Sequence, residues 1–212
     1  MGFSKKNKMI KVGAVSPRIR LCDVAYNTEV CIREAKRAAE LGVRVLVFPE
    51  LTLTGATCGD LFCQSPLAKR AEQGLAEFIE ATKDLDMMSL IGLPAETSYG
   101  FYSCTAVVYR GELLGLSALH GDEKYFDMPA DKLTKIDFAG QETKLYAYGV
   151  FTAPFDKDID VAVGTIFGLK KSPSIFAAPA SRMAVIEKTR FDRAASAVIR
   201  SEEHTSELQS QL

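Results

Sequence analysis

Glu50 occupies the position in this chain that most favours chemistry. The preceding segment, residues 43–48, is almost continuously apolar and rich in β-branched side chains, which predicts a strand buried on both faces. Pro49 cannot donate a ladder hydrogen bond and ends that strand. Glu50 therefore follows the carboxyl end of the strand, where layered α/β folds place their sites. The alternative is a solvated loop glutamate, because glutamate side chains are usually exposed.

The cysteines could supply a nucleophile or a metal site, but each also has an ordinary structural explanation. Cys31 fits the packed face of a helix and Cys104 the start of a strand, and free cysteine behaves as a small buried hydrophobe. Cys58 and Cys63 are close in sequence, yet the two further ligands of a closed zinc site are not nearby, so we predict no metal site. The odd count of five argues against a full disulfide framework; the five are Cys22, Cys31, Cys58, Cys63 and Cys104.

Several segments together resemble the nitrilase, or carbon-nitrogen hydrolase, superfamily. They are Lys11-Val12-Gly13-Ala14-Val15-Ser16-Pro17, Phe48-Pro49-Glu50-Leu51 with Thr54-Gly55, Thr57-Cys58-Gly59-Asp60-Leu61-Phe62, and Gly92-Leu93-Pro94. The segment at 57–62 narrows the resemblance to the glutamine amidase domain of glutamine-dependent NAD(+) synthetases, because the chemistry of the superfamily does not itself require it. The similarity runs over residues 8–119 and returns weakly around Pro179-Ala180-Ser181, Lys188 and Arg190.

The resemblance implies an amidase in which a cysteine thiolate attacks the side-chain amide of glutamine and releases ammonia. A carboxylate takes the proton of the thiol and later activates water, and Glu50 matches that base. Ser181 would line the acyl pocket, although a helix N-cap is an equally good explanation for it. The resemblance implies no cofactor for the amidase step; ATP would be used only by a C-terminal synthetase domain that this sequence lacks.

Three positions depart from the family pattern. The family places a lysine at the oxyanion, but the corresponding position here is Leu119, which can neither donate a hydrogen bond nor carry charge. Lys124 could replace that lysine only if the intervening turn differs, and a solvated lysine is the alternative. The stretch matching the nucleophile elbow, residues 161–168, contains no cysteine, and Ala56 stands where an aromatic usually shapes the glutamine pocket.

These observations lead to three functional hypotheses. The first is the glutamine amidase domain of a glutamine-dependent NAD(+) synthetase, catalytically impaired, with Glu50 as the one catalytic position retained. The second is a non-catalytic nitrilase-like module kept for assembly or regulation, and the third is another amidase of the superfamily that acts on a different small amide. The first also implies glutamine as ligand, a synthetase domain as partner and a homo-oligomer.

The last residues differ in kind from the rest of the chain. Residues 200–210, Arg-Ser-Glu-Glu-His-Thr-Ser-Glu-Leu-Gln-Ser, resemble the translation of a sequencing adapter. We therefore expect an amidase domain over 1–199 and an artefact over 200–212, which is excluded from fold reasoning. Without those residues the chain has 25 basic and 24 acidic residues instead of 26 and 27.

Charge and hydropathy exclude two classes of partner. The near-neutral chain has no basic stripe for nucleic acid. It also has no apolar run of the roughly 18 residues needed to cross a bilayer and no secretory segment. These features predict a cytoplasmic location, in which free thiols are usual.

The order of elements predicts one mixed α/β domain, and the resemblance implies a nitrilase-like four-layer αββα sandwich, truncated or degenerate in its C-terminal third. Asn27 is predicted to cap the first helix, and Arg110-Gly111-Glu112 to form a tight hairpin turn. Apolar stripes predict helices at about 27–41, 67–83 and 183–199. Strands are expected at 9–15, 43–48, 88–93, 104–109, 113–119, 145–150, 159–163 and 175–178.

Overall fold

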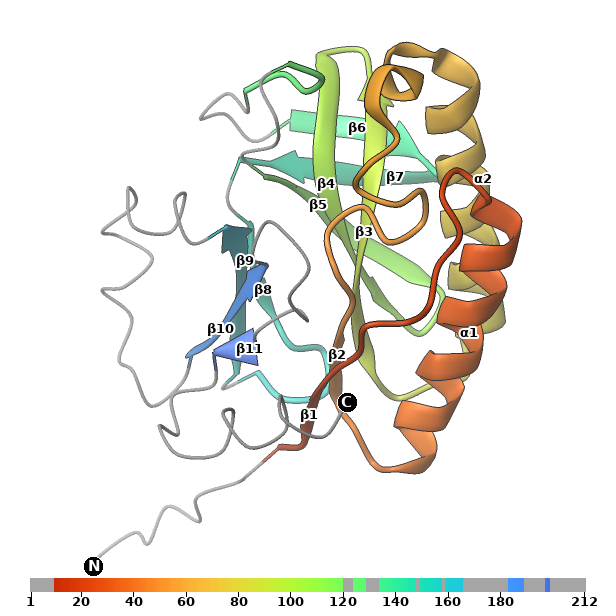
Figure 1. Ribbon diagram of the computed structural model, residues 1–212. Helices are drawn as coiled ribbons and strands as arrows, with labels where there is room; N and C mark the ends of the chain where they lie inside the picture. The colour runs from red at the N-terminus through yellow and green to blue at the C-terminus, as the bar shows by residue number, and fades with distance from the viewer. Residues whose placement is uncertain are drawn as a thin grey trace, which may run out of the picture.

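The computed structural model describes residues 10–119, 124–128, 134–147, 149–157, 159–165, 183–188 and 197–198. These residues form two β-sheets that lie face to face, with two helices on the outer face of the larger sheet (Figure 1). The strand expected at 175–178, Ser181 and the suspected artefact at 200–212 lie outside the described residues. None of the described helices is long and apolar enough to cross a membrane.

The larger sheet contains seven strands in the order β1-β2-β3-β4-β5-β7-β6. The first three are parallel, and β3, β4 and β5 continue as an antiparallel meander. The turn between β4 and β5 is the predicted hairpin, with Arg110 and Gly111 both at positive φ, as a two-residue hairpin loop requires. The strands are β1 (Val12–Ala14), β2 (Val45–Val47), β3 (Met88–Thr97), β4 (Gly100–Tyr109), β5 (Glu112–Leu119), β6 (Thr134–Phe138) and β7 (Gln141–Tyr146).

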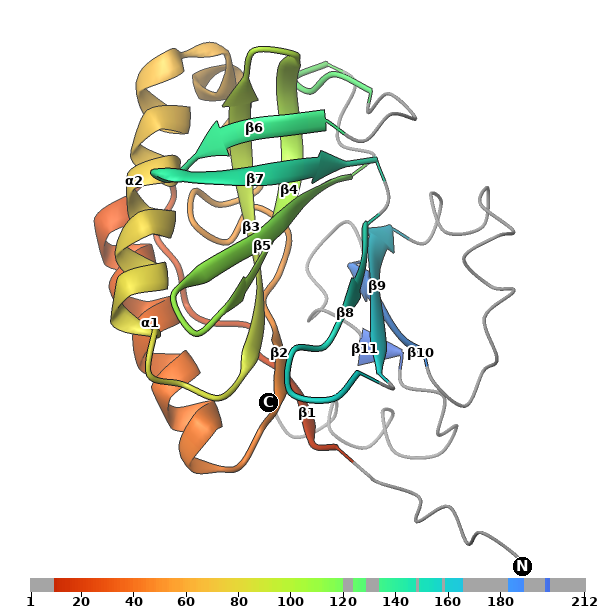
Figure 2. The same ribbon diagram turned by 180° about the vertical axis from the view of Figure 1, so that it is seen from behind.

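The smaller sheet packs on one face of the larger one, as the two opposite views show (Figures 1 and 2). Its order is β11-β10-β9-β8, with β8 (Gly149–Thr152), β9 (Asp160–Thr165), β10 (Met183–Lys188) and β11 (Ala197–Val198). An apolar cluster joins the sheets: Val45, Val47, Met88, Leu90 and Val107 from the larger, and Phe151, Val161 and Val163 from the smaller.

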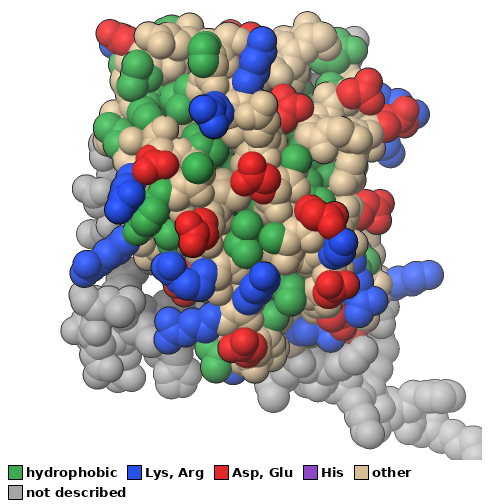
Figure 3. Space-filling view, turned by 90° about the vertical axis from the view of Figure 1, so that its right-hand side faces the viewer, with side chains coloured by type: hydrophobic (Ala, Val, Ile, Leu, Met, Phe, Trp, Pro, Cys, Tyr) green, Lys and Arg blue, Asp and Glu red, His purple; other side chains and the backbone are tan. Residues whose placement is uncertain are grey.

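Two helices cover the other face of the larger sheet, α1 (Val24–Glu40) and α2 (Ser65–Ala81). Their buried stripes contain Cys31, as predicted, together with Ala35, Ala71, Leu75 and Phe78. On the solvent side, acidic and basic side chains are interspersed over the helices rather than separated by sign (Figure 3). The described layers are therefore helix, sheet and sheet.

Several sequence-based boundaries were wrong. Helix α1 begins at Val24, capped by Asp23, whose Oδ1 accepts a hydrogen bond from the Tyr26 amide; Asn27 lies inside the helix. The predicted helix at 183–199 is wrong where it is described, because 183–188 forms β10 and pairs in parallel with β9. The periodicity of a short apolar run cannot distinguish a helix from a strand. Here pairing with β9 makes the segment a strand. The strand expected at 145–150 is divided between β7 and β8, and β6 was not predicted.

Candidate active site

Glu50 lies at the carboxyl end of β2, as predicted. The strand pairing extends one residue beyond β2, since the Phe48 amide donates a 2.8 Å hydrogen bond to the Leu90 carbonyl. The chain then turns, and the Thr52 hydroxyl binds the Pro49 carbonyl inside the turn. The Glu50 side chain is partly buried, so it is neither a core residue nor a fully solvated loop glutamate.

Gly92 on β3 provides the space for this turn. A Cβ atom at Gly92 would lie 2.5 Å from both the Leu51 amide nitrogen and the Pro49 carbonyl oxygen. The Leu53 amide also donates to the Gly92 carbonyl, at 3.2 Å. The backbone on both sides of Glu50 therefore rests directly on β3, and only glycine permits this approach.

Ser103 on β4 fixes the Glu50 carboxylate. Its hydroxyl donates a 2.6 Å hydrogen bond to Oε1 of Glu50, and the Ser103 residue is fully buried. In the antiparallel pairing of β4 with β5, the Cα partner of Ser103 is Leu119. Position 119, which the resemblance aligns with a lysine, thus lies on the strand next to the serine that binds Glu50.

An aromatic cluster packs beside the turn. Leu51 has a φ of +54°, a left-handed conformation that costs an L-residue roughly 1–2 kcal/mol, and is 4% exposed. It packs with Cys58, Phe62 and Phe126. Phe62 belongs to the short 3₁₀ helix η1 (Gly59–Cys63), so the segment that narrowed the resemblance supports the turn that carries Glu50.

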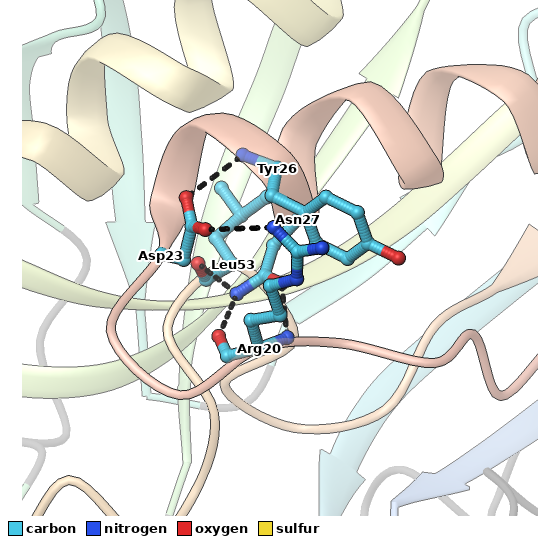
Figure 4. Close-up of polar contacts among 5 residues, drawn as sticks. All are labelled: Arg20, Asp23, Tyr26, Asn27 and Leu53. Carbon is cyan, nitrogen blue, oxygen red and sulfur yellow. Dashed lines mark hydrogen bonds and ion pairs between the residues drawn. The ribbon is translucent and has the colours of Figure 1, made fainter.

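Asn27 ties a second loop to the same turn. Its amide nitrogen donates to the carbonyls of Arg20, at 2.7 Å, and Leu53, at 3.1 Å, while its Oδ1 accepts from the Arg20 amide at 2.7 Å. Figure 4 shows the Asn27 side chain between these two backbones. Asn27 is fully buried, and its role is to join loops rather than to cap α1.

The elbow segment meets the larger sheet through a serine. The Ser117 hydroxyl donates to the Val163 carbonyl of β9 at 3.0 Å and accepts from the Gly149 amide at 2.9 Å. Strand β9 therefore docks on β5 two residues before Leu119. The strand itself contains no cysteine, and residues 166–168 of the predicted elbow lie outside the described part of the chain.

Lys124 lies on the surface, where it binds Asp60 rather than Glu50. Its Nζ is 3.2 Å from Oδ1 of Asp60 and 2.8 Å from the Tyr125 hydroxyl. The hydrogen bonds to Tyr125 and Asp60 raise the pKa of Lys124 to about 12. This lysine remains a cation in the ordinary pH range, but the structure places it with η1 and the aromatic cluster.

Among the five cysteines, two form a pair. Cys22 and Cys58 have their sulfur atoms 3.0 Å apart. Burial, followed by the hydrogen bond with Cys22, raises the pKa of Cys58 to about 12, so Cys58 is a poor source of thiolate at neutral pH. No group of three or more His, Cys, Asp or Glu side chains suited to a metal ion occurs among the residues the structure describes.

The structure thus places Glu50 and the backbone of position 119 next to the same residue, Ser103. It also adds Ser103, Gly92 and Asn27, whose site roles the sequence did not reveal. One signal for Ser103 was available, since hydroxyl residues alternate with apolar ones along a strand that is otherwise buried. That pattern predicts a polar patch on one sheet face, although it cannot name the partner.

Sequence comparisons relate this chain to known proteins. No protein-family model matches the chain. The glutamine-dependent NAD(+) synthetase of Mycobacterium leprae is 26% identical over 162 residues, which cover 76% of this chain and 23% of that protein. The chain therefore spans about a quarter of the length of that relative.

Two solved structures have a similar fold. The glutamine-dependent NAD(+) synthetase of Cytophaga hutchinsonii gives a TM-score of 0.67 at 17% identity, over 89% of this chain and 38% of that one. An amidase from Nesterenkonia sp. gives a TM-score of 0.61 at 18% identity, over 91% of this chain and 69% of that one. A variant of that amidase carries an acetamide moiety added covalently to its active-site cysteine. The chain has the nitrilase-like fold of these two proteins, and its sequence is similar to glutamine-dependent NAD(+) synthetases.

Proposed function

We propose that this chain is the glutamine amidase domain of a glutamine-dependent NAD(+) synthetase and that its amidase chemistry is impaired. The observation that supports the proposal is the Glu50 carboxylate after the end of β2, bound by Ser103, whose pairing partner on β5 is position 119. Similarity to synthetases of this kind supports glutamine as the ligand.

The proposed impairment follows from what surrounds Glu50. To act as general base for a cysteine nucleophile, Glu50 would need the thiol within hydrogen-bonding distance. The hydrogen bond that Glu50 receives comes instead from a serine hydroxyl. Cys104 adjoins Ser103 in sequence, yet it packs in the cluster on the helix side of the sheet. Leucine at position 119 adds no charge for an oxyanion. The proposed base, Glu50, therefore lacks its two proposed partners, the cysteine and the lysine, among the described residues.

Ammonia release from glutamine tests the catalytic part of the proposal. We expect background rates from the purified chain, from Glu50→Gln and from the control Glu77→Gln, whose side chain is exposed on α2. All three proteins should unfold cooperatively. Turnover by the wild-type chain and Glu77→Gln that is lost in Glu50→Gln would show a complete amidase and refute the impairment.

Ligand-induced stabilisation tests the substrate class. A ligand that binds only the folded state raises the midpoint of thermal unfolding, so glutamine should raise it and acetamide should not. Stabilisation by acetamide alone would favour an amidase for another small amide.

A non-catalytic nitrilase-like module is the second candidate. It is favoured by the same two observations, leucine at position 119 and no cysteine in residues 161–168. This candidate predicts cooperative folding with neither turnover nor stabilisation by glutamine.

The proposal also names partners beyond this chain. The alignment with the Mycobacterium leprae protein spans only 23% of that protein, and we propose that a synthetase domain, which uses ATP, is the natural partner of this domain. We also propose that the domain is cytoplasmic and homo-oligomeric. The amidase step itself would use no cofactor. Sequencing the genomic locus from adapter-free DNA should show codons that depart from this sequence near Arg200 and encode a nucleotide-binding domain; recovery of the same codons through Leu212 would refute that expectation.

A further inference from the structure

Cys22 and Cys58 meet although they are 36 positions apart in the sequence. Cys22 lies in the loop before α1, and Cys58 lies at the start of η1, after the turn that carries Glu50. Their Sγ atoms are 3.0 Å apart, and both thiols are free. A disulfide bond has a length of about 2.05 Å, so the two sulfurs need to approach by only about 1 Å.

The backbone around the pair is held from both sides. The Cys22 amide donates a 2.8 Å hydrogen bond to the Thr54 carbonyl, and Cys58 Sγ lies 3.2 Å from the same carbonyl oxygen. The Asn27 side chain links Arg20 to Leu53 next to these contacts (Figure 4). The backbone of Cys22 and the side chain of Cys58 thus bind the same carbonyl group.

The two thiols differ in access. Cys22 is partly exposed, whereas Cys58 is 6% exposed and packs with Leu51, Phe62 and Phe126. Burial raises the pKa of Cys58, which lowers its reactivity toward an oxidant in solution. Cys22 is therefore the thiol that meets an external reagent, and Cys58 is the buried thiol that can reach the Cys22 sulfur.

We propose that Cys22 and Cys58 are a modification site: a dithiol that a low-molecular-weight disulfide converts reversibly into an intrachain disulfide. The Cys22 thiolate attacks one sulfur of the small disulfide, forming a mixed disulfide and expelling one small thiolate, which takes up the proton that Cys22 released. Cys58 gives up its proton as its sulfur attacks the Cys22 sulfur and expels the second small thiolate, and that thiolate takes up the proton of Cys58. Two protein thiols are oxidised, and one small disulfide is reduced to two thiols.

The bond would fasten the loop before α1 to the segment that carries Glu50. This consequence goes beyond the proposed amidase function and does not require turnover. The loop closed between the two cysteines is long enough for a stabilising cross-link, and we expect the midpoint of thermal unfolding to rise by about 5 °C on oxidation.

The test uses the full chain and glutathione disulfide, with dithiothreitol to reverse the reaction. After trapping of free thiols and denaturation, the oxidised wild-type chain should have lost two of its five thiols, and dithiothreitol should restore them. The control Cys63→Ser, which removes an exposed cysteine, should also lose two. Cys22→Ser and Cys58→Ser should form no intrachain disulfide, and their unfolding midpoints should not rise with oxidant.

Peptide mapping of the wild-type chain gives a readout that needs no variant. Trypsin yields residues 21–33, which contain Cys22 and Cys31, and residues 45–69, which contain Cys58 and Cys63; fragmentation of the linked peptides should place the bond between Cys22 and Cys58. A bond to Cys63, glutathione that remains on Cys22, or five free thiols after treatment would each overturn the proposal.

Discussion

The Ser103 hydroxyl and the Glu50 carboxylate are joined by a 2.6 Å hydrogen bond across 53 positions of sequence. Glu50 follows the end of a parallel strand, whereas Ser103 lies in the antiparallel part of the same sheet and pairs with Leu119. Ser103 therefore fixes the carboxylate through a hydrogen bond, while the backbone of residues 49–51 packs directly against Gly92. Under the proposed function, a base held in this way is preorganised, although the cysteine and lysine that the resemblance implies are missing from their positions among the described residues.

Replacing Ser103 with alanine should lower the free energy of unfolding by about 1–2 kcal/mol, because the substitution removes a buried donor to a charged acceptor. Ser65→Ala is a matched control, since Ser65 donates to Glu96 at 2.9 Å on the exposed surface and should cost less than about 0.5 kcal/mol. Urea unfolding of both variants measures the difference. Equal losses would mean that Ser103 does not hold the carboxylate in solution.

Gly92→Ala tests the close approach of the Glu50 turn to β3. The new Cβ would lie 2.5 Å from backbone atoms of Leu51 and Pro49. We expect the free energy of unfolding to fall by about 2–3 kcal/mol, because backbone atoms cannot move aside as a side chain can. Gly13→Ala, also in a strand, places its Cβ 3.3 Å from the Val43 side chain. That control should change stability by less than about 1 kcal/mol, and a similar cost for both glycines would contradict the packing argument.

The sequence predicted those parts of the fold that local pattern determines. The run before Pro49 placed Glu50 at a strand end, and two amphipathic stripes placed both described helices to within a few residues. The glycine-containing turn after Tyr109 gave the β4–β5 hairpin. In each case a repeat of apolar residues, or a single turn residue, indicates the local structure of several neighbouring positions.

The remaining features depend on contacts between distant segments. Asp23 and Asn27 are both good N-cap residues, so local chemistry could not decide which one caps α1; the carbonyls of Arg20 and Leu53 decided it by binding Asn27. The partner of Ser103 depends on the register of three strands. A run of six residues at 183–188 is too short for its period to indicate the strand that forms beside β9.

Asn27→Ala should lower the free energy of unfolding by about 3 kcal/mol. The change removes three hydrogen bonds and leaves the Leu53 carbonyl without its buried donor. Asp23→Ala is the comparison, because loss of the α1 cap alone costs about 1 kcal/mol. Amide hydrogen exchange at Arg20 should accelerate in Asn27→Ala but not in Asp23→Ala. Unchanged exchange at Arg20 in both variants would refute the proposed link between the loops.

The Cys58 thiol should make the reduced chain sensitive to alkaline pH. Burial and the hydrogen bond with Cys22 raise its pKa from 9.0 to about 12, so above pH 9 the folded chain keeps a proton that the unfolded chain releases. The unfolded state then binds fewer protons, and stability falls as pH rises, by up to about 1.4 kcal/mol per pH unit for this group. The contribution is fully present below pH 9 and is lost toward pH 12.

Denaturant unfolding at pH 8 to 10.5 in dithiothreitol measures this slope. Other groups titrate in the same range, including Tyr109, whose pKa is raised by burial and then by its hydrogen bond to Asp86. The contribution of Cys58 is therefore isolated by comparing the slopes of the variants with the slope of the wild-type chain. Cys58→Ala should lose less stability with rising pH than the wild-type chain, because it lacks the buried thiol. Cys63→Ala, which removes an exposed thiol, should follow the wild-type slope. Parallel curves for Cys58→Ala and the wild-type chain would show that the Cys58 thiol ionises equally easily in the folded and unfolded states.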